Sequence, residues 1–231
     1  MKNFLKVLPN LIQYNLKVIF GSKFIWFILA ALAFFIIFMI NGISSGEVVQ
    51  ESMVYSIMFF PGILLIFYPT VYCMQSDEDT RILEILFCIP NYRYKVWLFR
   101  LLMVYVIFYI FLVLFSYLAT YLLYPVEEFT MAAQMMFPLL FLGNMAFMMS
   151  TFLKSGNATA VVMIVLGILF VTMGSGQVYY NLQLNPFDPP SNMHELLWSN
   201  LLLKNRLFLA IGAVIFLLMG LLNLQKRERF V

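Results

Sequence analysis

The side chains that could do chemistry in this chain are concentrated in one short segment, Asp77-Glu-Asp-Thr-Arg-Ile-Leu-Glu-Ile-Leu-Phe-Cys-Ile-Pro90. Ser76 and Asp79 have the spacing of a capping box, and the acidic run places negative charge at the positive end of a helix. Arg81 and Glu84 are spaced to pair at i, i+3. The apolar residues recur on one helical face, namely Ile82, Ile85, Leu86 and Ile89. This pattern predicts a short amphipathic helix suited to protein recognition.

Two interpretations of this helix remain open. In the first, it lies flat under a membrane and packs against its own neighbouring spans. In the second, it is a docking helix that transmits motion from a cytosolic partner to the second and third spans.

The rest of the chain consists mostly of long apolar stretches. Of the 231 residues, 63% are hydrophobic and only 11% are charged, whereas about a quarter of a soluble domain is charged. A helix needs about 20 apolar residues to cross a bilayer. We therefore expect one all-α domain, residues 1–231, with six transmembrane helices that lack acidic and basic residues. The predicted spans are Phe24–Ile43, Met53–Met74, Leu101–Tyr124, Phe129–Leu153, Ala158–Tyr180 and Leu207–Leu224.

The positions of lysine and arginine predict the orientation, because cytosolic loops retain them. With the amino terminus inside, only Lys204 and Arg206 of the 14 basic residues fall outside. Both termini are then cytoplasmic, and the net charge of +3 reflects topology and not binding to nucleic acid. Residues 4–20 are expected to form an amphipathic interfacial helix against the membrane lipids. Residues 193–203 are expected to form a second interfacial helix, in the last outer loop.

The sequence predicts neither an enzyme nor a metal or cofactor site in this chain. No phosphate-binding loop of the form Gly-x-x-x-x-Gly-Lys-Ser/Thr occurs, so the chain has no ATPase site of its own. The predicted spans offer only neutral polar groups, which usually form interhelical hydrogen bonds. They are Gln134, Asn144, Thr159, Thr172 and Gln177. Because ion-coupled carriers keep ionisable residues within the membrane, we infer that any driving force comes from a partner. Gly167 and Gly174 favour close helix contact at the fifth span, either within one subunit, which is the preferred interpretation, or between two subunits.

The central segment resembles a motif in the membrane subunits of ATP-binding-cassette exporters of the second class. That motif has an acidic cluster, a Gly-Thr-Leu-Glu-like element, a leucine pair, a proline and two later basic residues. Where the family often has Gly-Thr, this chain has Arg81-Ile82. The matching residues here are Asp77, Asp79, Leu83, Glu84, Leu86, Pro90, Arg93 and Arg100. The six predicted spans and the amino-terminal interfacial helix are also similar to that family's layout.

The resemblance implies a permease subunit in the cell membrane that pairs with a second permease subunit, identical or related. Each subunit would dock on a cytosolic ATPase that holds ATP and magnesium, and the pair would export a hydrophobic or amphipathic substrate. Segment 77–90 would be the coupling helix, with Arg81 and Glu84 as polar contacts. The alternative is a membrane scaffold that transports nothing, such as an immunity or assembly factor.

Overall fold

Six helices and no strand are present in the part of the chain that the computed structural model describes. The described residues are 24–44, 49–72, 93–153, 155–174, 180–191 and 193–226. In chain order the helices are α2 (Phe24–Ser44), α3 (Glu51–Val71), α6 (Arg93–Leu122), α7 (Glu128–Leu153), α8 (Gly156–Gly174) and α9 (Glu195–Lys226). The predicted all-α class is therefore confirmed for these residues. The predicted helices at 4–20 and 77–90 lie outside them.

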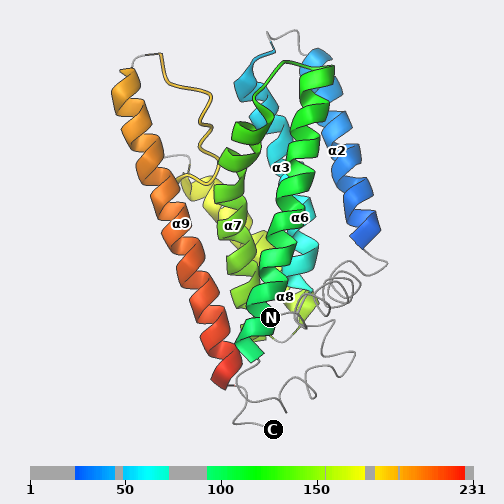
Figure 1. Ribbon diagram of the computed structural model, residues 1–231, viewed down its shortest axis with the longest axis vertical. Helices are drawn as coiled ribbons and strands as arrows, with labels where there is room; N and C mark the ends of the chain where they lie inside the picture. Colours follow the sequence, from blue (N-terminus) through cyan, green and yellow to red (C-terminus); the bar gives the residue numbers. More distant parts are fainter. Residues whose placement is uncertain are drawn as a thin grey trace, which may run out of the picture.

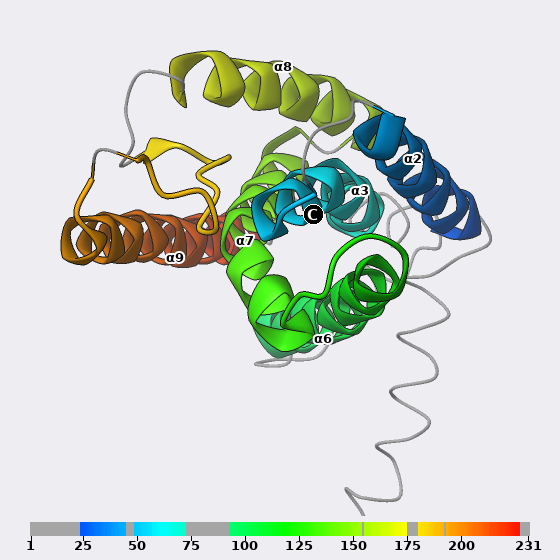
Figure 2. The same cartoon turned by 90° about the horizontal axis from the view of Figure 1, so that it is seen from above.

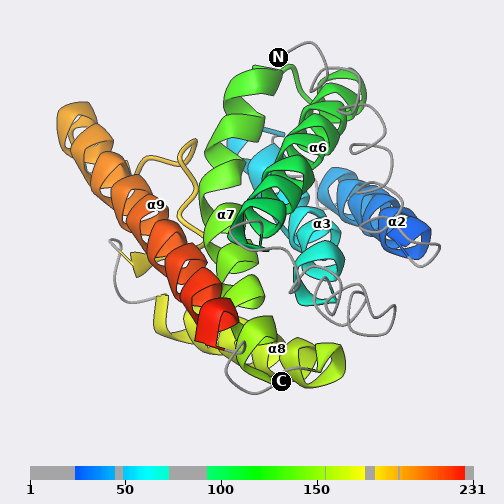
Figure 3. The ribbon, with the colours of Figure 1, turned by 60° about the horizontal axis from the view of Figure 1, so that its bottom comes forward.

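Five of the described helices, α2, α3, α6, α7 and α9, are long and apolar enough to cross a membrane. The predicted span Ala158–Tyr180 corresponds to α8, which has a shorter apolar stretch, Gly156–Phe170. In Figure 2, α6 and α7 are seen almost end-on while α8 is seen from the side, so α8 crosses the bundle steeply (Figures 2 and 3). This arrangement is consistent with a polytopic α-helical membrane protein.

Helices α3 and α7 form the centre of the bundle (Figure 1). In each, 67% of the most apolar window is buried within the chain, against 17% for α2 and 28% for α9. Helix α3 packs on α2, α6 and α7, and α7 packs on α8 and α9 as well. A displacement of α3 would therefore act on much of the bundle.

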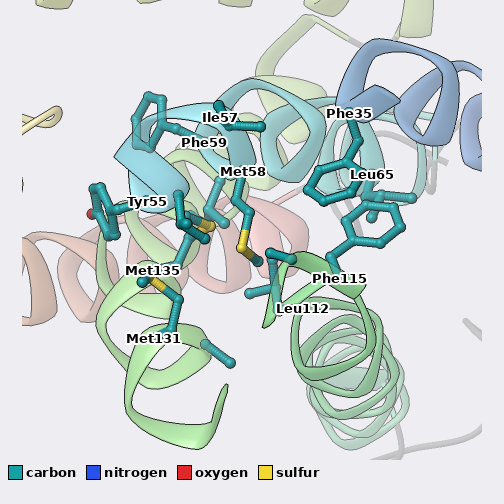
Figure 4. Close-up of a cluster of buried hydrophobic side chains, with 14 of the residues drawn as sticks. Phe35, Tyr55, Ile57, Met58, Phe59, Leu65, Leu112, Phe115, Met131 and Met135 are labelled. Carbon is teal, nitrogen blue, oxygen red and sulfur yellow. The ribbon is translucent and has the colours of Figure 1, made fainter. Parts of the chain in front are cut away.

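The largest buried cluster joins α2, α3, α6 and α7 (Figure 4). Phe35 and Phe115 stack with ring centroids 5.3 Å apart. Met58 and Leu112 are fully buried beside them. The methionines fill the space between helices because their unbranched side chains adapt to irregular gaps.

Glycines let α9 approach α7 closely. A Cβ on Gly212 would lie 2.5 Å from the Phe141 ring, and one on Gly220 would lie 2.8 Å from the Phe147 ring. A Cβ on Gly167 would meet nothing within 4 Å in the described structure. The predicted close packing within the chain is thus wrong at Gly167, and contact between subunits at this position stays a prediction. Within the chain, glycines allow close helix contact on α9 instead.

The outer faces of α2, α6 and α9 expose large apolar side chains. Examples are Trp26 at 72%, Ile110 at 58% and Ile211 at 58% exposed. So much apolar surface would be a liability in water but matches a hydrocarbon environment. The exposed apolar faces therefore support insertion in a bilayer.

Two helices are longer than the sequence predicted. Helix α6 begins at Arg93 instead of Leu101, and α9 begins at Glu195 instead of Leu207. The expected interfacial helix at 193–203 is therefore not separate, because it continues into the last span. Consequently Arg100 and Arg206 lie inside helices, which corrects the expectation that the spans lack charged residues.

Candidate functional site

The predicted coupling segment connects two packed helices. Helix α3 ends at Val71, which is fully buried, and α6 begins at Arg93. The predicted site residues Asp77, Asp79, Arg81, Leu83, Glu84, Leu86 and Pro90 lie outside the described residues. Arg93 is placed as the first residue of α6.

Arg100, the second basic residue of the motif, is buried at the start of α6. Its side chain is only 2% exposed. Its guanidinium carbon lies 4.9 Å from the centroid of the Trp97 ring, a distance that allows a cation–π interaction. Trp97 in turn packs with Phe147 of α7, at 6.2 Å between ring centroids. The α6 end of the segment is therefore fixed to the core.

At the other end of the bundle, residues 180–191 form a non-helical loop that folds inward between α9 and the α3–α7 pair (Figures 1 and 2). Leu182 and Leu184 are buried, and the Phe187 ring packs 6.0 Å from the Tyr55 ring. Non-helical backbone is tolerated at membrane depth only where protein buries it or where it lines a cavity.

Side chains of α9 hold this loop in place, together with an asparagine of the loop itself. Asn205 Nδ2 donates to the Asn181 carbonyl at 3.0 Å, and Trp198 Nε1 donates to the Pro186 carbonyl at 3.3 Å. From the loop, Asn185 Nδ2 donates to the Ser52 carbonyl at 2.7 Å. The loop is thereby attached to both α3 and α9.

Arg206 of α9 is the centre of this region. It is 6% exposed and makes three hydrogen bonds to neutral acceptors. Nε donates to Gln134 Oε1 at 3.0 Å, one terminal nitrogen donates to Asn205 Oδ1 at 3.2 Å, and the other donates to the Leu184 carbonyl at 3.3 Å. Its guanidinium carbon also lies 5.7 Å from the Phe137 ring centroid. A buried ionisable residue in a membrane helix is a candidate functional site.

No carboxylate of the described structure lies inside a helix near mid-length. The acidic residues of the six helices are Glu51, Glu128 and Glu195, and each stands in the first turn of its helix. There they complement the positive helix end. Arginine stays protonated in proteins, so Arg206 offers a fixed positive charge and not a proton relay.

Sequence reasoning placed Gln134 in a span but put Arg206 in an outer loop. One signal could have revealed Arg206. Residues two apart on a helix point to nearly opposite sides, so Lys204 and Arg206 cannot both face outward on one helix. Lys204 is exposed and Arg206 is buried. No pattern in the sequence indicated that the Tyr55 hydroxyl and the Leu184 carbonyl would lie near Arg206.

The chain was compared with protein-family models, curated proteins and solved structures, and nothing in the three sets matches it.

Proposed function

We propose that the chain is the membrane-spanning permease subunit of an ATP-binding-cassette transporter of the second class. It would sit in the cell membrane with six spans, both termini in the cytoplasm and residues 4–20 in the interface. Two such subunits would pair and recruit two cytosolic ATPase subunits. The pair would export a hydrophobic or amphipathic substrate.

The observation that carries the proposal is the position of the charged segment between the central helix α3 and α6. Helix α3 packs on α2, α6 and α7, and the first two turns of α6 place Trp97 and Arg100 in the core, where both are buried. A force applied to residues 73–92 would therefore be transmitted at both ends to packed helices. A coupling helix requires this connection.

The lack of acidic residues in helix interiors supports the same proposal. Carriers driven by a proton or cation gradient use titratable or anionic groups within the membrane. The described helices contain carboxylates only in their first turns, and the two buried arginines bind no cation. The driving force would then come from the ATPase.

The test begins with co-expression of the chain and the products of its neighbouring genes. We expect an ATPase to co-purify with the chain in detergent. The double variant Arg81→Ala/Glu84→Ala should then lower substrate-stimulated ATP turnover several-fold, while its helix content and yield stay at wild-type values.

A matched control is Lys204→Ala/Glu195→Ala, which also removes one basic and one acidic residue but does so on α9. Turnover should be normal in this control. Normal turnover in the Arg81/Glu84 variant would remove the docking role of those residues. Absence of any co-purifying ATPase would favour the scaffold alternative.

A further inference from the structure

Arg100 of α6 is a cation in the interior of the bundle. Its side chain is 2% exposed, and its guanidinium carbon lies 4.9 Å from the Trp97 ring centroid. The ring offsets only part of the cost of burying a charge. Arginine keeps its proton in proteins, so the residue cannot avoid this cost by becoming neutral. A carboxylate close to the guanidinium would compensate the charge best.

The acidic residues that the described structure places lie at the opposite end of the bundle. Glu128 begins α7, and Phe147, which packs on Trp97, lies about 29 Å further along that helix at 1.5 Å per residue. Glu47 is four positions before the start of α3, so it belongs to the same distant end. The others begin α3 or α9, or lie in the connections at that end, namely Glu51, Glu127, Asp188 and Glu195. None of these carboxylates is close enough to compensate Arg100.

Among the remaining acidic residues of the chain, one group suits Arg100. Glu84 is spaced to pair with Arg81. Glu228 stands between two arginines in the basic tail of the chain, where its charge is already compensated and the surplus positive charge repels another cation. Residues 77–79, here called the acidic run, are three consecutive carboxyl residues with no basic residue among them. The acidic run therefore has the charge that complements Arg100.

Helix α3 brings the chain to the depth of Arg100. A Cβ on Gly143 of α7 would lie 2.8 Å from Ile66 Cδ1 and 3.1 Å from the Tyr105 hydroxyl oxygen, so α3 and α6 meet at this point. The two helices pack on each other and run in opposite directions (Figure 1). Val71 follows Ile66 by five residues and Arg100 precedes Tyr105 by five, so both lie about 7.5 Å from the meeting point toward the same end. The chain therefore leaves α3 at the level of Arg100.

We propose that a carboxylate of the acidic run forms an ion pair with Arg100. The run begins six residues after Val71, and six extended residues span up to about 20 Å, so the connection is long enough. The pair would fasten the predicted coupling segment to the core of α6. This contact goes beyond the proposed function, because it lies within the chain and requires no ATPase. Arg81 and Glu84 stay the predicted contacts with the ATPase.

Double-mutant cycles on the purified full chain test the pair, with equilibrium unfolding by dodecyl sulfate in mixed micelles as the measurement. Arg100→Gln should lower the folding equilibrium constant about tenfold or more, because the carboxylate is left without its partner. The neutralised run, Asp77→Asn/Glu78→Gln/Asp79→Asn, should lower it by a similar factor. Combining the two should lower it little further, since both remove the same ion pair. Effects that multiply independently would overturn the proposal.

Glu84→Gln and Glu228→Gln are the matched controls, because each removes a carboxylate outside the acidic run. Each should act independently of Arg100→Gln, and coupling of Arg100 to either residue in place of the run would overturn the assignment. If Arg100→Gln does not fold, amide hydrogen exchange of the neutralised run decides. Residues 97–104 of α6 should exchange about tenfold faster, while the start of α9 keeps its rate. Unchanged exchange in α6 would overturn the ion pair.

Discussion

Tyr105 on α6 and Asn144 on α7 are joined by a 2.5 Å hydrogen bond from the Tyr105 hydroxyl to Asn144 Oδ1. The bond crosses the helix interface where Gly143 admits the Tyr105 side chain: a Cβ on Gly143 would lie 3.1 Å from the Tyr105 hydroxyl oxygen. The neutral polar residue Asn144 thus has the interhelical role that its residue type predicted.

Tyr105→Phe should lower stability by about 0.6 kcal/mol and by no more than about 1.7 kcal/mol, the range measured for hydrogen bonds between membrane helices. Thermal or denaturant unfolding in detergent would measure it. Tyr117→Phe is the matched control, because Tyr117 is on the same helix and is 64% exposed. A loss in the control equal to that in Tyr105→Phe would show that the interhelical bond is not responsible.

Gly220→Ala should destabilise the packing of α9 on α7. The added Cβ would lie 2.8 Å from the fully buried Phe147 ring and 3.3 Å from the Met148 Cα. We expect a loss of about 1–3 kcal/mol, as for other overpacked sites. Gly167→Ala, which meets nothing within 4 Å in the described structure, should be neutral or stabilising by up to about 1 kcal/mol, because alanine favours helix. Equal effects of the two substitutions on unfolding would contradict the α7–α9 contact.

Asn185→Ala should release the inward-folded loop. It removes the hydrogen bond to the Ser52 carbonyl and the acceptor for the Phe187 N–H at 3.0 Å. Amide hydrogen exchange of residues 180–191 should become faster, while exchange in α7 stays slow. Gln183→Ala is a control in the same loop, since the Gln183 side chain forms none of the hydrogen bonds that hold the loop to the helices. Unchanged protection in Asn185→Ala would show that the other contacts suffice.

Cysteine labelling tests the orientation. In a background with Cys73→Ser and Cys88→Ser, Gln50→Cys should react with an impermeant reagent added outside intact cells, and Lys226→Cys should react only after the cells are opened. This follows from the distribution of lysine and arginine. The reverse labelling pattern would invert the predicted topology.

The apolar runs predicted the helices well because hydrocarbon length fixes how many apolar residues a span needs. The predicted span Phe24–Ile43 differs from α2 by one residue, and Phe129–Leu153 differs from α7 by one. The predicted helix boundaries were wrong where charged residues lie within a helix, as in α6 and α9. Arg100 and Arg206 were assigned to loops, although each is buried within a helix by contacts from other parts of the chain.

The candidate site could be predicted only in part for the same reason. Gln134 was identified as a polar residue within a span, but its partner is 72 residues away on α9. The position of the Leu184 carbonyl depends on how the loop folds inward, which no local pattern encodes. The predicted coupling residues from Asp77 to Pro90 stay a prediction.

The tethers of the inward-folded loop have a consequence for how the protein is made. Asn205, Arg206 and Trp198 all come from α9, which is the last of the described helices in chain order. Until that helix enters the bilayer, the loop has no partner on that side and one flank of α7 stays open to lipid. This half of the described bundle is therefore completed only once α9 has been synthesised and inserted, so a chain truncated before α9 would present unfinished surfaces to membrane quality-control proteases.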